Sequence, residues 1–212
     1  LWWDYDILTM RMTIAKETET AKWGYASLDT DGPWVISTTH AVMYRAPITI
    51  DMYFYSEWLI IHNGVIIVNP GKSEIVDGVI NYDFQTRTEY SWDGCTPKRW
   101  WLRYKIIGTP DISNTTEAIS TIDGPVPITW PLSSRASLLH DALCQYMHLH
   151  PVTRKHTDTL FRQLLTTNAP IHAIVYYMGV RLGAVICRVK KQSPSHTLVL
   201  SEDTASFLNK LT

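Results

Sequence analysis

The second half of the chain contains two stretches in which apolar residues recur at helical spacing. In residues 133–147, apolar side chains stand three or four positions apart, and the same period runs through residues 153–161 to Leu165. This period is typical of amphipathic helices, so both stretches are predicted to be helical. Only residues 148–152 separate them. Helices joined by so short a connection usually pack antiparallel, with their apolar faces together.

Each predicted helix carries one ionisable residue on its apolar face, His140 on the first and Asp158 on the second. Because the two faces meet, we expect His140 and Asp158 to lie within hydrogen-bonding distance. A buried carboxylate fixes the tautomer of a neighbouring imidazole and raises its basicity, as a general base requires. The alternative is a satisfied polar pair that only joins two helices.

Residues 169–189 form a third candidate helix, with Pro170 in its first turn. Its apolar residues form a stripe at helical spacing: Ile171, Ile174, Val175, Met178, Leu182 and Val185. We expect this stripe to pack on the first two helices. A membrane span is less favoured, because Arg181 would lie within it and a charge is costly in lipid. Arg181 is expected either to extend its charged end to solvent or to pair with a buried carboxylate.

Before residue 132 the pattern changes to β-branched and aromatic runs separated by turn residues. The runs that read as strands are residues 34–40, 47–55, 57–62 and 64–69. Asn63-Gly64, between the last two, is typical of a type I′ hairpin turn. Residues 111–132, rich in small polar residues and proline, are predicted to form a loop. Strands first and helices later indicate an α+β fold.

Composition places the chain among globular proteins and removes one class of partner. It has 212 residues, a formal net charge of −1 and 45% hydrophobic residues, enough for a core. A nearly neutral chain gives no reason to expect nucleic-acid binding. We divide it into a β-rich segment (1–82), a core segment with the three helices (83–187) and a tail (188–212), in which residues 203–211 can form a short helix.

Cysteine spacing, the first ten residues and the histidines near the helix connection give three further indications. Cys95, Cys144 and Cys187 are widely spaced and show no zinc-binding pattern, which indicates a reducing or disulfide-independent setting. The first ten residues carry acids where a secretory signal has bases, so no such signal is expected. The histidines near the helix connection could bind zinc or be ordinary surface residues: His148, His150 and His156.

Five short motifs occur in a fixed order within residues 84–187. They are YSWDGCTPKRWW, IGTPD, ASLLHDALCQY, RKHTDTLF and YYMGVRLGA. In this order they resemble an uncharacterised domain family of bacteriophages and bacteria, whose members typically show Asp-Gly-Ala-Ser-x-Pro-Arg, Ile-Gly-x-Pro, His-Asp-x-Leu-Tyr and Ala-Asp-x-x-Phe. The resemblance implies supporting roles for a set of residues outside the helix pair: Asp93, Gly94, Lys98 and Gly108. Cys95, Lys98 and Cys144 depart from the family pattern, which has Ala, Arg and Tyr there.

His140-Asp141 on one helix, with Asp158 on an antiparallel partner, is also similar to phospholipases of the A2 type. This resemblance implies that His140 activates water, that Asp158 orients the His140 ring and that Asp141 binds calcium. Calcium would polarise an ester carbonyl. Carbonyl ligands could come from the IGTPD turn or from residues 123–125. Arg154 is expected on a solvated face or beside Asp141.

Two functions therefore compete. The first is a cation-dependent ester hydrolase, acting on a lipid or another ester, with calcium at Asp141. The second is a non-catalytic component of a phage particle that uses its aromatic β region to contact other virion proteins. Both imply a location in the host cytoplasm or the virion, without a transmembrane segment. We also expect residues 93–98 to pack beside the start of the first predicted helix.

Overall fold

The computed structural model describes residues 12–16, 34–38, 41–92, 114–121, 124–131, 133–186 and 198–212. Strands come first along the chain, and three helices follow: α1 (Ser134–Gln145), α2 (Arg154–Asn168) and α3 (Pro170–Ile186). A fourth helix, α4 (Glu202–Asn209), lies in the tail, where a short helix was expected at residues 203–211; it starts one residue earlier and ends two residues earlier. The predicted α+β fold is confirmed, with four helices rather than three among the described residues.

Four antiparallel strands form the central sheet, in the order β3-β6-β5-β4. Their bounds are β3 (Val42–Arg45), β4 (Tyr53–Tyr55), β5 (Leu59–His62) and β6 (Val65–Val68). Asn63 and Gly64 join β5 to β6 with φ angles of 43° and 87°. Two positive φ angles at these positions confirm the predicted type I′ turn. All residues of β5 and β6 are buried, because both faces of this sheet are covered.

Two smaller sheets and a hairpin complete the described strands. One sheet has the order β1-β2-β9, and the other has the order β12-β8-β7. Their bounds are β1 (Met12–Lys16), β2 (Trp34–Thr38), β9 (Tyr90–Trp92), β7 (Lys72–Val76), β8 (Val79–Asp83) and β12 (Val199–Leu200). β10 (Asn114–Thr121) and β11 (Gly124–Pro131) pair antiparallel.

Two predictions about the β region were wrong. Residues 47–55 are not one strand, because a 3₁₀ turn (η1, Pro47–Thr49) occupies their start, with Pro47 in its first turn. Residues 111–132 are not a loop, because most of them form the β10–β11 hairpin. The prolines that suggested a loop stand at positions 125, 127 and 131. Alternate residues of a strand turn their N–H groups to the same edge, so these prolines need not break any ladder bond to β10.

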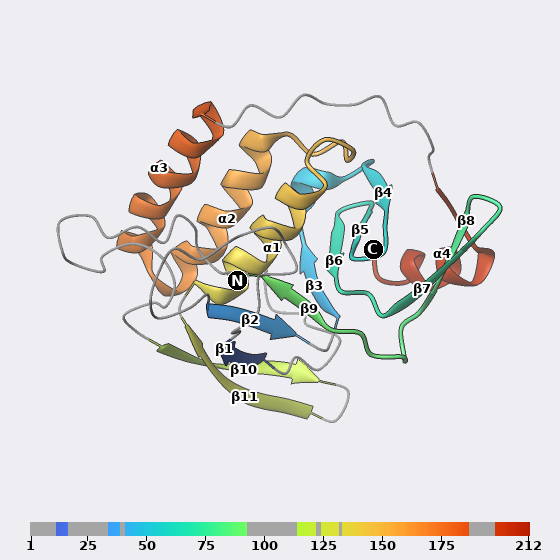
Figure 1. The fold of residues 1–212 in the computed structure, drawn as a ribbon, viewed down its shortest axis with the longest axis horizontal. Coiled ribbons are helices and arrows are strands. Elements are labelled where there is room, and N and C mark those ends of the chain that lie inside the picture. Colours follow the sequence, from blue (N-terminus) through green and yellow to red (C-terminus); the bar gives the residue numbers. More distant parts are fainter. Residues whose placement is uncertain are drawn as a thin grey trace.

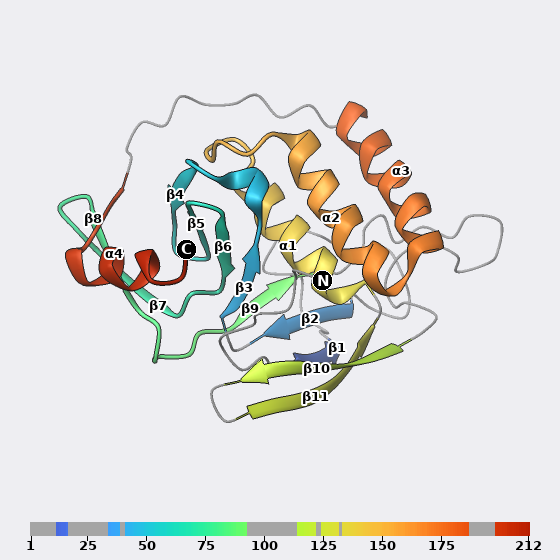
Figure 2. The same cartoon turned by 180° about the vertical axis from the view of Figure 1, so that it is seen from behind.

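The helices form successive layers on one face of the central sheet. In both views α1 lies nearest the sheet, α2 lies beyond it and α3 is outermost (Figure 1 and Figure 2). α1 buries Leu138, Leu139 and Leu143 in one cluster with strand residues such as Leu59 and Ile66. This cluster contains residues from both of the predicted segments, 1–82 and 83–187. The opposite face of the sheet packs on β8 and α4 through a second cluster.

The third helix packs through a different face from the one predicted. On α3, the residues Ala173, Tyr176 and Val180 pack against Phe161 and Leu165 of α2. The expected stripe instead points away from the other helices, with Ile171, Ile174, Val175, Met178 and Leu182 between 41% and 76% exposed. The side chain of Val185 lies outside the described part of the structure. The prediction was wrong because α3 is apolar on more than one side, so its period alone does not select the buried face.

The sequence predicts no transmembrane segment. None of the described helices combines the length and the apolar character that crossing a membrane would need.

A pair of substitutions can test which face of α3 packs on α2. Ala173→Leu adds volume where the side chain is 1% exposed, so it should lower the free energy of unfolding by about 1–3 kcal/mol through overpacking. Ile174→Ala, one residue along, should change it by no more than about 0.5 kcal/mol, because Ile174 is exposed. Urea unfolding of both variants measures the two values. The reverse ranking would mean that the stripe faces α2 after all.

Candidate active site

The α1–α2 connection is held in place by local hydrogen bonds at both helix ends. Thr153 is the N-cap of α2, where its hydroxyl accepts a hydrogen bond from the His156 backbone N–H at 3.2 Å. At the end of α1, His150 Nε2 donates to the Leu143 carbonyl oxygen at 2.7 Å. These bonds satisfy backbone groups that a helix end leaves without partners. The two helices run antiparallel (Figure 1), and both ends of their connection are hydrogen-bonded.

His140 and Asp158 meet across this helix pair. The distance from His140 Nε2 to Asp158 Oδ1 is 3.0 Å, which confirms the predicted contact. The Asp158 side chain has no exposed surface, and His140 is 8% exposed. The Phe161 ring lies against the imidazole, with 5.0 Å between ring centroids. A carboxylate can only accept a hydrogen bond, so Nε2 carries the proton and Nδ1 is the nitrogen open to further exchange.

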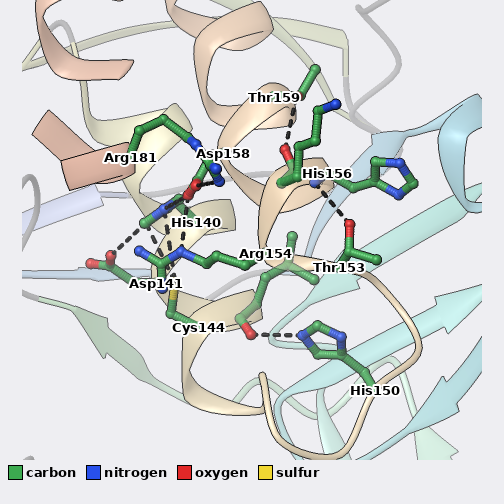
Figure 3. Close-up of polar contacts among 12 residues, drawn as sticks. His140, Asp141, Cys144, His150, Thr153, Arg154, His156, Asp158, Thr159 and Arg181 are labelled. Carbon is green, nitrogen blue, oxygen red and sulfur yellow. Dashed lines mark hydrogen bonds and ion pairs between the residues drawn. The ribbon is translucent and has the colours of Figure 1, made fainter. Parts of the chain in front are cut away.

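Two arginines also bind Asp158. Arg154, one helical turn earlier in α2, donates from Nε to Oδ1 at 3.0 Å, and Arg181 of α3 donates from Nη1 to Oδ2 at 2.9 Å. The expectation that Arg181 could pair with a buried carboxylate is confirmed. Arg154 was placed wrongly, because its guanidinium binds Asp158 rather than Asp141 or solvent alone. Asp158 thus connects α1, α2 and α3 (Figure 3).

These contacts set the charge states of the pair. Burial alone would raise the pKa of Asp158, but hydrogen bonds from His140 and Arg181, with the charge of Arg154, lower it below its usual value. Burial alone would lower the pKa of His140, but its contacts with Asp141, Asp158 and Cys144 raise it well above 6.5. Asp158 is therefore ionised at neutral pH, and His140 binds a proton more tightly than a free imidazole does.

Asp141 lies on the other side of the imidazole. Its Oδ1 is 3.6 Å from His140 Nδ1, and its side chain is partly exposed at the edge of α1, as expected. Within the described ranges, no group of three His, Cys, Asp or Glu residues is arranged to hold a metal ion. Calcium at Asp141 therefore stays a prediction, and zinc at His148, His150 and His156 gains no support.

Cys144 also belongs to this polar cluster, whose other members are His140, Asp141, Arg154, Asp158 and Arg181, although the sequence did not predict it there. Its Sγ accepts a hydrogen bond from Arg154 Nη1 at 3.1 Å and lies 3.7 Å from His140 Nδ1. Residues four apart on a helix are neighbours, so the spacing of His140 and Cys144 already contained the signal. In the sequence, Cys144 stood out only as a departure from the resembled family pattern.

The remaining supporting residues lie outside the described part of the chain: Asp93, Gly94, Lys98 and Gly108. The expected packing of residues 93–98 beside α1 thus stays a prediction. Trp92, directly before them, does contact α1, because its Nε1 donates to Ser137 Oγ at 3.0 Å.

Comparison of the chain with protein-family models, with curated proteins and with solved structures gives no match. The resemblances to a phage domain family and to phospholipases of the A2 type therefore stay predictions. The geometry of the side chains around Asp158 is therefore what indicates a function.

Removing the charge of Asp158 tests how strongly the cluster depends on it. Asp158→Asn removes the carboxylate that two guanidinium groups and the His140 ring share, so it should lower the free energy of unfolding by about 3–5 kcal/mol. Asp77→Asn is the matched control, because Asp77 lies in an exposed turn at a φ of 51°, a conformation that Asn also adopts. Equal effects of the two substitutions in urea unfolding would contradict the proposed importance of Asp158.

The raised pKa of His140 predicts how stability depends on pH. The folded state holds the His140 proton at pH values where the unfolded chain has lost it, so its contribution is complete below pH 6.5. The contribution decreases as the pH rises from there through the pKa of the folded state. The free energy of unfolding should therefore fall more steeply above pH 6.5 in the wild type than in His140→Gln. Parallel curves for the two proteins would show that His140 contributes nothing to this slope.

Proposed function

We propose that the protein is an ester hydrolase whose general base is His140, oriented by Asp158. The observation that carries this proposal is the 3.0 Å hydrogen bond from His140 Nε2 to a fully buried carboxylate. It leaves Nδ1 directed toward the partly exposed edge of α1, where Asp141 lies. A base within reach of a nucleophile, and itself oriented by a third group, is the usual arrangement for nucleophilic attack on a carbonyl.

In this proposal each member of the cluster has a separate task. His140 Nδ1 accepts the proton of the attacking nucleophile, and Asp158 stabilises the resulting imidazolium. Arg181 and Arg154 keep Asp158 ionised, as their 2.9 Å and 3.0 Å contacts indicate. Asp141 would bind a calcium ion, which would supply electrophilic polarisation of the ester carbonyl. A neutral His140 is needed for the first step, so its raised pKa favours turnover in alkaline solution.

The exposed face of α3 supports an apolar ester as the substrate class. The helix that supplies Arg181 to the cluster also presents a row of exposed apolar residues: Ile171, Ile174, Val175, Met178 and Leu182. Contiguous apolar surface of this kind is suited to binding other apolar groups. Acyl chains of a lipid could occupy such a surface.

The proposal predicts ester hydrolysis that requires His140 and Asp141. Cleavage of p-nitrophenyl esters and of phospholipid vesicles should fall at least about 100-fold in His140→Gln, because the base is removed. Asp141→Asn should reproduce the loss that a calcium chelator causes in the wild type. His172→Gln and Asp77→Asn are matched controls at exposed positions and should keep full activity.

Three results would separate the parts of this proposal. Activity that survives His140→Gln would remove His140 as the base. Activity that needs His140 but ignores both chelator and Asp141→Asn would remove the calcium ion and keep the hydrolase. Absence of turnover in the folded wild type would contradict the hydrolase itself.

The second candidate is a non-catalytic particle component. The exposed α3 face also favours this function, since apolar surface of this kind marks protein contacts too. The aromatic β region contributes less than the sequence suggested. Tyr44, Tyr82, Tyr90 and Trp92 are buried, and Tyr53 is exposed. Within the described part of the chain, contact with other virion proteins would use exposed apolar residues such as those of α3 rather than these buried aromatic residues.

A further inference from the structure

Cys144 belongs to an ordered series of three side chains. Its Sγ lies beside His140, and His140 is hydrogen-bonded to Asp158. Cys144 is a partly exposed free cysteine, whereas Asp158 is fully buried. A nucleophile next to a base, with that base oriented by a buried acid, is the arrangement that activates side-chain nucleophiles in many unrelated folds.

We propose that Cys144 is the nucleophile of the ester cleavage, so that the acyl group passes through a thioester on Sγ. This inference rests on the proposed function and names the group that attacks the carbonyl carbon. It replaces direct attack by water in the first step and keeps the roles of His140 and Asp158.

Arg154 provides the second reason for choosing Cys144. One guanidinium group binds both ends of the series, with Nε 3.0 Å from Asp158 Oδ1 and Nη1 3.1 Å from Cys144 Sγ. A side chain that donates to the sulfur holds it next to the base, as attack on a carbonyl carbon requires. It also fixes the position of the sulfur relative to the acid that orients the base.

The position of the sulfur determines which nitrogen exchanges its proton. Sγ lies 3.7 Å from Nδ1 and 3.8 Å from Nε2, so it faces the ring between the two nitrogens. Asp158 already binds Nε2, which leaves Nδ1 for the thiol. Proton transfer then requires a rotation of Cys144 or of the ring that brings Sγ into line with Nδ1.

The proposed reaction consumes only the ester and one water molecule. The Cys144 thiol gives its proton to His140, and the sulfur forms a bond to the ester carbonyl carbon. The C–O bond to the alcohol then breaks, and the departing oxygen takes the proton from His140. Water next attacks the thioester and gives a proton to His140, and the C–S bond breaks. The Cys144 thiolate regains that proton, so ester and water have become acid and alcohol.

The reactivity of Cys144 can be measured without any turnover. In a Cys95→Ser, Cys187→Ser background, Cys144 is the one thiol of the chain. Its reaction with iodoacetamide at pH 7 should be at least about tenfold faster than that of glutathione, because Arg154 holds the sulfur beside His140, which can take the thiol proton during attack. Arg154→Gln should remove this advantage. Arg162→Gln should keep it, since Arg162 lies on the same helix but is exposed and stacks on Tyr177.

The thioester itself gives the decisive readout. Acid quenching during hydrolysis of p-nitrophenyl acetate should leave an acetyl group on the Cys144 peptide, detected by mass spectrometry. Cys144→Ala should lose hydrolysis as fully as His140→Gln does. Full turnover in Cys144→Ala, with loss in His140→Gln, would overturn the inference and leave the hydrolase standing. If the wild type cleaves no ester, the hydrolase fails, and labelling no faster than glutathione would overturn the reactive thiol as well.

Discussion

The arrangement of the three long helices depends on one buried carboxylate. Asp158 of α2 accepts hydrogen bonds from His140 of α1 and from Arg181 of α3, and a third from Arg154 in its own helix. A buried charge left without a partner costs about 3–5 kcal/mol, a large part of the stability of a typical domain, so a packing that brings cations to Asp158 is strongly favoured. α3 must therefore turn Arg181 toward α2. The same rotation places Ala173 and Tyr176 inside and leaves the apolar stripe outside.

The sequence was sufficient where a short-range rule determined the answer. The His140–Asp158 contact followed from two helical periods and a short connection, and the β5–β6 turn followed from Asn63-Gly64. It was insufficient where several arrangements satisfied the same rule. The period of α3 could not choose between two apolar faces, because Arg181 makes that choice through a residue 23 positions away. The prolines of β11 suggested a loop. That they all stand on the same edge of one strand becomes clear only when the pairing register with β10 is known.

The side chains that hold the helices together are also the ones proposed to do chemistry. Arg154 and Arg181 keep Asp158 ionised, and Asp158 keeps the His140 ring in one orientation. A base positioned in this way does not have to be ordered when a substrate arrives, which lowers the cost of reaching the reactive geometry. The cluster would therefore be rigid for structural reasons even before any substrate binds.

The pairing of β12 with β8 has a consequence for the order of folding. Residues 198–212 cover the second face of the central sheet, where Leu208 packs with Met43, Ile60 and Ile67. His62 Nε2 and Asn209 Oδ1 lie 3.1 Å apart although 147 positions separate them in the chain. During synthesis on a ribosome, strands 42–68 leave the exit tunnel long before these covering residues do. Part of this apolar face then stays uncovered until residues 198–212 emerge, and in that interval a chaperone could bind it.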